Sequence, residues 1–328
     1  MVNAEHIIEH IDGVLFEEVS YRKYLDDWLN GMKSEVYFWQ QYMETKKSDS
    51  PDEWADLISN DRAFGLDEYL TSDKTKFLDV GSGPFSTCGL KTIKTELEFH
   101  AVDPLAYIYT ALKEKKNILS GVTPHFAMVE RLDEKFEQNE FDIVHMRNAL
   151  DHAFNPILGI MQLLSICKIG GKIILCHAKN EAENENYSGF HQWNLCPIDD
   201  EFVIWRPGVK YNVSRMFSDY ADVSVNNETP NESPGHFTVV LIKKKEAGFQ
   251  NNPVQRKVTT LLNEHIFKKL SEMIVTDACR RHRLLIVQMK KSVRKIPFVG
   301  YWARKIYETY QLNKRKGRGI DERKTPCQ

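Results

Sequence analysis

The chain has 328 residues, with 44 Lys and Arg against 46 Asp and Glu, and a formal net charge of −2. Its 42% hydrophobic content, including 6 Trp and 17 Phe, excludes a disordered chain, and its length suffices for about two domains. No stretch approaches the roughly 20 consecutive apolar residues of a membrane span. The acidic first residues predict neither a signal peptide nor a transit peptide.

Residues 1–70 are predicted to form a helical N-terminal cap. Apolar residues recur there at intervals of three and four, as in Tyr24, Trp28 and Met32, which is the spacing of an amphipathic helix. Ser50 and Pro51 are typical of a helix start, so a further helix is expected over residues 52–59.

Residues 71–245 alternate between strands and helices, which predicts an α/β fold with a doubly wound, Rossmann-like parallel sheet. A long final strand after a Gly- and Pro-containing turn is expected to pair antiparallel. The strands are predicted at residues 77–80, 97–102, 123–128, 141–146, 172–176, 221–225 and 236–242, with helices at 110–119 and 156–169 and an insertion near 181–212.

The first motif is Phe77-Leu78-Asp79-Val80-Gly81-Ser82-Gly83-Pro84, a strand that ends in a Gly-x-Gly turn. The turn is expected to open a helix, and its glycines allow the backbone to approach a ligand closely. Alone, it is equally typical of an ordinary tight turn.

Three further motifs follow in order. Val102-Asp103-Pro104 ends the next strand, where an acidic side chain can accept both hydroxyls of a ribose. Arg147-Asn148-Ala149-Leu150-Asp151-His152 follows the fourth strand, and Ile169-Gly170-Gly171 is expected to close the helix before the fifth.

Together these motifs resemble those of class I S-adenosylmethionine-dependent methyltransferases over about residues 70 to 245. The resemblance implies S-adenosylmethionine as the cofactor, with the methionine and ribose ends near the first two motifs and adenine beside residues 129–132. The implied cofactor-binding residues are Asp79, Gly81, Ser82, Gly83, Asp103, Pro104, Val129, Glu130, Arg147 and Asn148.

Two positions depart from the family pattern. Phe85 and Ser86 stand where a third glycine is usual, and Met128 stands where an Asp often holds the adenine amino group. A nicotinamide enzyme is the main alternative for such a turn. The missing third glycine and the later motifs disfavour it.

The insertion combines aromatic rings with amide and imidazole groups, which suits stacking and hydrogen bonding to a sugar. Tyr187 to Leu195 resembles a segment of bacterial methyltransferases linked to cell-surface polysaccharide and capsule synthesis. A well-packed lid is the alternative interpretation. The predicted substrate-binding residues are Arg147, Tyr187, Gln192, Trp193, Asn194 and Trp205.

O-methylation of a sugar or glycoconjugate requires a base for the hydroxyl proton, and histidine is suited to that role near neutral pH. His191 is the first candidate, with His152 and His177 as the others. The alternative functions are methylation of another small metabolite or lipid head group, and a non-catalytic methyltransferase-like scaffold.

The six cysteines are widely spaced without a Cys-x-x-Cys pair, so no disulfide framework or metal site is predicted, and a cytoplasmic location fits.

Residues 246–328 are predicted as a basic helical extension. From Lys243 onward the chain carries 22 Lys and Arg against 7 Asp and Glu, whereas the preceding part is strongly acidic. General nucleic-acid binding by that acidic body is therefore not expected. The mixture of aromatic and basic residues from Ile296 to Tyr307 is typical of a helix on the anionic inner face of the cytoplasmic membrane. Packing on the acidic body and homodimer formation are the alternatives.

Overall fold

The computed structural model describes residues 18–118, 121–228, 235–246 and 248–249, with residues 256, 260, 265, 266 and 268–270. The chain divides into two units, Met1–Thr260 and Leu261–Gln328, and the first contains the sheet and the predicted helical cap. The predicted membrane-surface segment, Ile296 to Tyr307, lies outside the described residues. Among the described helices, none combines the length and apolar character that crossing a bilayer requires.

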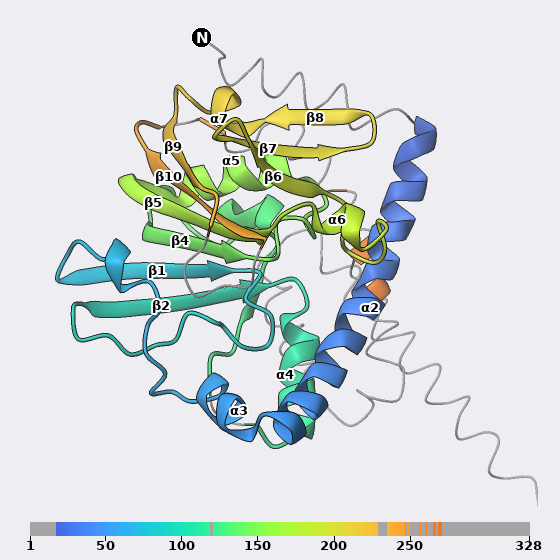
Figure 1. The fold of residues 1–328 in the computed structure, drawn as a ribbon, viewed down its shortest axis with the longest axis vertical. Coiled ribbons are helices and arrows are strands. Elements are labelled where there is room, and N and C mark those ends of the chain that lie inside the picture. Colours follow the sequence, from blue (N-terminus) through green and yellow to red (C-terminus); the bar gives the residue numbers. More distant parts are fainter. Residues whose placement is uncertain are drawn as a thin grey trace, which may run out of the picture. The chain divides into compact units, whose positions relative to one another are not determined.

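The core of the first unit is a seven-stranded sheet with the strand order β3-β2-β1-β4-β5-β10-β9. Of these seven strands, only β10 runs opposite to the rest, and it pairs antiparallel with both β5 and β9, as expected for the final strand. The fold is therefore the predicted α/β class with a Rossmann-like sheet (Figure 1). The strands are β1 (Lys74–Val80), β2 (Glu96–Asp103), β3 (His125–Phe126), β4 (Phe141–Arg147), β5 (Cys167–Ala178), β9 (Ala221–Asn226) and β10 (His236–Lys243).

The strand order reverses between β1 and β4, which lie side by side in the middle of the sheet. In such sheets the carboxyl ends of the strands on either side of the reversal leave a crevice that binds ligands. Here those ends carry the glycine loop after Val80, Asp103 of β2 and Arg147 of β4.

The long helix α2 (Glu18–Asp49) passes the carboxyl ends of these strands, and α3 (Pro51–Leu57) follows it (Figure 1, blue). Leu25, Trp28, Leu29 and Met32 recur at the spacing of one helix face and are buried. Ser50 and Pro51 occupy the predicted N-cap and first positions of α3. The amphipathic pattern therefore predicted helix α2 correctly.

Helix α5 (Pro156–Ile166) is buried at all of its residues, as expected for a sequence that is apolar all round except at Gln162 and Ser165. The Asn155 side chain caps it by accepting a hydrogen bond from the backbone N–H of Leu158 at 3.0 Å. The other helical elements of the sheet domain are η1 (Asp67–Tyr69), α4 (Ala106–Lys115) and η2 (Val129–Glu134).

The predicted insertion forms a separate three-stranded sheet of β6 (Asn194–Ile198), β7 (Glu201–Arg206) and β8 (Val209–Asn212). Asp199 and Asp200, both at positive φ, make the tight turn between β6 and β7. The flanking helices are α6 (Glu181–Asn184) and α7 (Val213–Met216). Figure 1 shows α6 beside α2, on the side where the arrowheads of β1 and β2 end.

The helix expected after the Gly-x-Gly turn is wrong, because the described residues between β1 and β2 contain none. Gly81, Gly83 and Gly89 adopt positive φ values of 69°, 62° and 75°, which a right-handed helix cannot contain. The segment instead forms backbone hydrogen bonds with residues 62–65, including one from the Gly65 N–H to the Cys88 carbonyl oxygen at 2.8 Å.

The expectation that Gly170-Gly171 would close a helix is also wrong. Helix α5 ends at Ile166, and both glycines lie inside β5, with Gly170 at a φ of 78°. The third strand is only His125–Phe126, and η2 begins three residues later. Apolar runs alone did not distinguish these short elements.

The contact between α2 and the insertion generates a stability prediction. A Cβ atom at Gly31 would lie 2.6 Å from the backbone carbon of Gly189 and 2.7 Å from Phe190. Alanine is preferred over glycine inside a helix by about 1 kcal/mol, so Gly31→Ala would stabilise the protein if this contact were absent. We expect the clash to dominate and to lower the free energy of unfolding by about 1–3 kcal/mol in denaturant titrations.

Gly65→Ala is the matched control, because a Cβ atom there would meet its nearest neighbour at an ordinary 3.8 Å. Its free energy of unfolding should change by no more than about 0.5 kcal/mol. An increase in stability for Gly31→Ala would contradict the close packing of α2 on the insertion.

Candidate functional site

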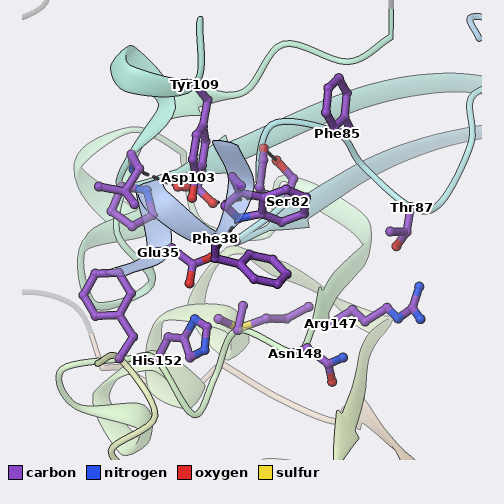
Figure 2. Close-up of a pocket in the computed structure, with 18 of the residues that line it drawn as sticks. Glu35, Phe38, Ser82, Phe85, Thr87, Asp103, Tyr109, Arg147, Asn148 and His152 are labelled. Carbon is purple, nitrogen blue, oxygen red and sulfur yellow. Dashed lines mark hydrogen bonds between the residues drawn. The ribbon is translucent and has the colours of Figure 1, made fainter. Parts of the chain in front are cut away.

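A cavity of about 1090 Å³ lies where the strand ends meet α2. It is lined by residues of the β1 loop, β2, β4, α2 and the insertion, several of which are labelled in Figure 2. All of the predicted cofactor-binding residues lie on its wall: Asp79, Gly81, Ser82, Gly83, Asp103, Pro104, Val129, Glu130, Arg147 and Asn148.

The Asp103 carboxylate joins the ends of β1 and β2. One of its oxygens accepts a hydrogen bond from the Gly83 N–H at 3.0 Å, and the other accepts one from the Leu105 N–H at 2.7 Å. Burial raises the pKa of Asp103 to about 7, although the two backbone donors oppose the shift. Because a carboxylate has about four lone-pair sites, it retains the capacity to accept bonds from a ligand.

The glycines of the loop are required by their neighbours as well as by their backbone angles. A Cβ atom at Gly81 would lie 2.5 Å from the Ala149 Cβ, and one at Gly83 would lie 2.7 Å from the Trp39 ring. The Trp39 ring is held by a hydrogen bond from its Nε1 to a Glu35 carboxylate oxygen at 2.7 Å. The loop backbone therefore packs directly against α2.

Asp79 is engaged by a partner that the sequence did not identify. Its Oδ1 lies 2.8 Å from Nδ1 of His145, and the same nitrogen lies 3.2 Å from Sγ of Cys88. All three side chains are buried, and burial raises the pKa of the Cys88 thiol well above its ordinary value, so the thiol stays neutral. A polar residue at an inward-facing position of β4 was the only sequence signal for His145.

Glu130 and Asn148 hold elements around the cavity. Glu130 accepts a hydrogen bond from the Asn155 N–H at 3.0 Å, and burial raises the pKa of its carboxyl group. Asn148 adopts a positive φ of 43°, and its Oδ1 accepts a hydrogen bond from the Ala178 N–H at 3.1 Å. These contacts tie η2 to α5 and the end of β4 to the end of β5.

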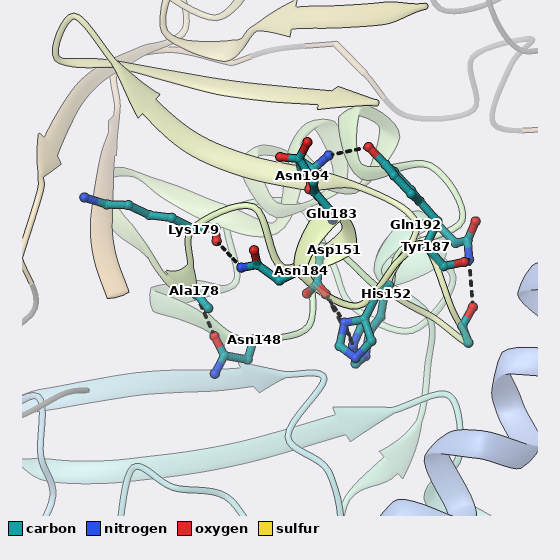
Figure 3. A network of polar contacts seen from close by, with 12 residues as sticks. Asn148, Asp151, His152, Ala178, Lys179, Glu183, Asn184, Tyr187, Gln192 and Asn194 are labelled. Atoms are coloured by element: carbon teal, nitrogen blue, oxygen red, sulfur yellow. Dashed lines mark hydrogen bonds and ion pairs between the residues drawn. The ribbon is translucent and has the colours of Figure 1, made fainter. Parts of the chain in front are cut away.

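Asp151, His152 and His191 form a polar cluster, and its two histidines line the cavity. Figure 3 labels Asp151 and His152 of this cluster. Nδ1 of His191 is 2.8 Å from Oδ2 of Asp151 and 3.1 Å from Nε2 of His152. Both histidines line the cavity, whereas Asp151 is buried behind them.

The charges of this cluster influence one another. Burial lowers the pKa of His191, but the hydrogen bond and charge of Asp151 outweigh it, so the pKa is raised. For Asp151, burial raises the pKa, but the charges of His152 and His191 and the hydrogen bond from His191 outweigh it, so the pKa is lowered. The arrangement thus favours an ionised Asp151 beside a readily protonated His191.

The third predicted base, His177, lies elsewhere. Its side chain on β5 is 1% exposed and is not among the residues that line the cavity. Burial lowers its pKa to about 3. Neither ring nitrogen has a hydrogen-bond partner among the described residues. The geometry therefore leaves His191 and His152 as the histidines that a ligand in the cavity could reach.

The aromatic and amide residues of the insertion mostly stabilise the insertion itself. Asn194 donates a hydrogen bond to the Tyr187 hydroxyl at 2.9 Å, and Gln192 donates to the Tyr187 and Gly189 carbonyls (Figure 3). Trp193 is 1% exposed, and Trp205 donates to the Asn180 side chain at 3.2 Å. None of these predicted substrate-binding residues is among the described residues that line the cavity.

The insertion residues that do line the cavity are Glu181, Glu185, Ser188, Gly189, Phe190 and His191. Helix α2 contributes Trp28, Phe38 and Trp39, which the sequence analysis assigned only to the helix. Trp28 donates a hydrogen bond from its Nε1 to the His152 carbonyl at 2.8 Å, and its ring lies 5.2 Å from that of Phe190. The cluster of aromatic residues between positions 37 and 42 was the sequence signal that could have indicated that α2 lines a ligand site.

Similarity to known proteins is found among solved structures. A scan against models of protein families gives no match, and a search of curated proteins gives none either. A search of solved structures gives distant matches that include proteins described as methyltransferases.

Three of these structures illustrate the range. The CurJ carbon methyltransferase is 15% identical over 54% of this chain and 51% of that chain, with a TM-score of 0.37. A SAM-dependent methyltransferase from Aquifex aeolicus is 15% identical over 60% of this chain and 96% of that chain, with a TM-score of 0.35. The trans-methyltransferase CalH, in complex with SAH, is 11% identical over 52% of this chain and 51% of that chain, with a TM-score of 0.37. This chain thus covers about half of the CurJ and CalH chains.

The raised pKa of Asp103 should make the free energy of unfolding depend on pH. Because its pKa rises from 3.8 to about 7 on folding, its contribution to stability is present at low pH and is lost as the pH rises through about 7. Asp103→Asn removes this titration. The free energy of unfolding of the wild type should therefore fall relative to that of Asp103→Asn between pH 4 and pH 7, as measured by urea titration. Parallel pH profiles for the two proteins would contradict the buried, proton-binding state of Asp103.

Proposed function

We propose that the protein is an S-adenosylmethionine-dependent methyltransferase. The observation that carries the proposal is the buried Asp103 carboxylate, which ends β2 on the cavity wall and accepts a hydrogen bond from Gly83 of the β1 loop. A carboxylate at that position can accept both hydroxyls of a ribose, and glycine backbone beside it allows close approach of the ligand.

The remaining cavity walls fit the other parts of this cofactor. Met128 and Val129 offer apolar surface for a purine. The N–H groups of Gly81 and Asn148 already donate to the Val102 and Cys176 carbonyls, so the carbonyl oxygens of Gly81 and Asn148 are the backbone groups that would accept bonds from the amino group at the methionine end. Single-ligand pockets measure roughly 300–1,000 Å³. The cavity of about 1090 Å³ therefore leaves room for an acceptor beside the cofactor.

When bound, S-adenosylmethionine supplies a methyl group already activated on a sulfonium. The chain has to align the acceptor, exclude water and receive the proton that the acceptor releases. Helix α2 covers the cavity through Trp39, which packs against Gly83, and through Trp28, which is fixed to the His152 carbonyl. These two contacts limit the access of water from that side.

We assign to His191 the role of the base that accepts the proton of the acceptor hydroxyl. With the hydrogen on its Nδ1 donated to Asp151, its Nε2 has a lone pair for the proton of an acceptor hydroxyl. Asp151 orients the ring and stabilises the imidazolium that forms, as a carboxylate does in other acid–base pairs. His152, at 3.1 Å from His191, is the alternative base on the same wall.

We further propose a sugar or glycoconjugate hydroxyl as the acceptor, as in the synthesis of cell-envelope polysaccharide. Phe38, which is 53% exposed and lines the cavity, offers a flat apolar face for a sugar ring. Glu181, Glu185 and Ser188 on the opposite wall offer hydrogen-bond acceptors for hydroxyls. In this proposal these residues make the substrate contacts that were predicted from the sequence for Tyr187, Gln192, Trp193, Asn194 and Trp205.

Turnover of labelled S-adenosylmethionine with a panel of acceptors tests this assignment. Methylation of nucleotide sugars or lipid-linked glycans supports the sugar acceptor, and methylation confined to other metabolites or lipid head groups contradicts it. Cofactor binding without turnover on any acceptor would instead favour a scaffold role.

Asp103→Ala is expected to weaken the binding of S-adenosylhomocysteine by about 1.5–3 kcal/mol, because it removes hydrogen bonds to a charged group. Isothermal titration calorimetry measures this change. Asp73→Ala, an exposed aspartate just before β1 at the opposite edge of the sheet, is the control and should bind as the wild type does. Equal affinities for wild type and Asp103→Ala would contradict the ribose contact.

His191→Ala is expected to lower the turnover number by about 10²–10⁴-fold, the usual contribution of a general base, while cofactor affinity persists. Because Asp151 raises the pKa of His191 above its ordinary 6.5, the wild-type rate should rise with pH through a midpoint above that value. Asp151→Asn should move the midpoint to lower pH. Unchanged turnover for His191→Ala at saturating acceptor would transfer the role to His152.

A further inference from the structure

The segment just after α3 is fixed against the irregular loop that follows the Gly-x-Gly turn. The Arg62 carbonyl oxygen accepts hydrogen bonds from the N–H groups of Leu90 and Lys91, each at 2.9 Å. Gly89 permits this approach, because a Cβ atom there would lie 2.0 Å from the Ala63 carbonyl oxygen. Arg62 is therefore anchored to the same loop that forms the floor of the cavity.

The Arg62 side chain extends from this anchor to the cavity wall. Its Nε forms an ion pair with Oδ2 of Asp56 at 3.1 Å, which orients the guanidinium group. Its Nη1 is buried and has no hydrogen-bond partner among the described residues. A buried guanidinium N–H without an acceptor is costly, and a bound anion would supply the missing acceptor.

A second guanidinium group lies in the same region. Arg147 ends β4 on the cavity wall, and Figure 2 shows it extending below Thr87 of the loop. Burial raises the pKa of the Cys88 thiol, and Arg147 and Arg62 are both close enough to Cys88 for their charges to oppose this rise. Two positive groups from distant parts of the chain therefore border one lobe of the cavity.

This lobe adjoins the glycine loop at its methionine-facing end. Arg147 lies two residues before Ala149, whose Cβ is the neighbour that excludes a side chain from Gly81. In many α/β sites a helix following the first strand presents its N-terminal N–H groups to an anion. The described residues 81–95 contain no helix, so an anion bound here would need another donor.

We propose that Arg62, together with Arg147, binds a carboxylate group in this lobe of the cavity. The inference rests on the proposed cofactor, whose amino-acid carboxylate is the source that the adjacent glycine loop favours. An acidic group of the acceptor has the same chemistry and is the second source. Guanidinium groups are suited to either because they donate parallel hydrogen bonds to both carboxylate oxygens.

The test compares two nucleosides that differ in the relevant group. S-adenosylhomocysteine carries the amino-acid carboxylate, and methylthioadenosine lacks it. By calorimetry, Arg62→Ala should lower the affinity for S-adenosylhomocysteine by about 10-fold or more. The affinity for methylthioadenosine should change by less than about twofold. Arg62→Lys keeps the charge without the planar fork and should recover part of the loss. Arg215→Ala, an exposed arginine that pairs with Glu201, is the control.

The outcomes separate the two sources. A loss of affinity confined to S-adenosylhomocysteine supports the cofactor as the source of the carboxylate. Unchanged affinity for both nucleosides, with a higher KM for an acidic acceptor, supports the acceptor carboxylate. Thermal unfolding first establishes that the variant is folded. An equal loss of affinity for both nucleosides, or no change in any measurement, then overturns the proposal.

Malonate provides a measurement that does not depend on the proposed function. If the wild type binds neither nucleoside, the methyltransferase assignment fails, but the carboxylate site is still tested. Malonate should then raise the thermal midpoint of the wild type and of the Arg215→Ala control, and should do so less for Arg62→Ala. Equal shifts in all three proteins would overturn the carboxylate site itself.

Discussion

The hydrogen bonds that the Asp103 carboxylate accepts from Gly83 and Leu105 determine the geometry of the candidate site. They join the loop after β1 to the end of β2, on one side of the point where the strand order reverses. Because Trp39 occupies the space that a side chain at Gly83 would need, the same loop also positions α2. One buried carboxylate therefore links the floor of the cavity to the helix that covers it.

This arrangement has an electrostatic consequence. Burial raises the pKa of Asp103 to about 7, so its ionised form is costly without further donors. A ligand with two adjacent hydroxyls would supply those donors and would favour the ionised carboxylate. At the other end of the cavity, Asp151 raises the pKa of His191 instead. The pKa values of Asp103 and His191 are thus shifted by different causes within one cavity. The first shift suits ligand binding, and the second suits proton transfer.

Much of the fold follows from local sequence signals. Alternating apolar runs located β1, β2 and β4, and the spacing of Asp103 from the glycine turn placed both at one edge of the sheet. The helix that the Gly-x-Gly motif predicted after the turn is absent from the described residues, because Gly81, Gly83 and Gly89 adopt positive φ values. Local periodicity does not reveal such backbone angles.

The site was harder to predict where it depends on distant contacts. Aromatic and amide residues such as Asn194 and Tyr187 have the composition of a ligand site, yet they bond to each other within the insertion. Conversely, Trp39 and Arg62 reach the cavity from segments that precede β1 in the chain, and His145 binds Asp79 from another strand. No spacing rule links these residues, because the sheet and α2 bring them together only in the folded protein.

Hydrogen–deuterium exchange with and without S-adenosylhomocysteine tests the central claim most directly, since it reports both binding and location. The cavity geometry predicts slower exchange of backbone amides in the loop after β1, at the end of β2, in residues 127–130 and in α2 around Trp39, with little change in β9. Protection confined to other parts of the chain, or no protection at saturating ligand, would contradict the assignment of this cavity as the cofactor site.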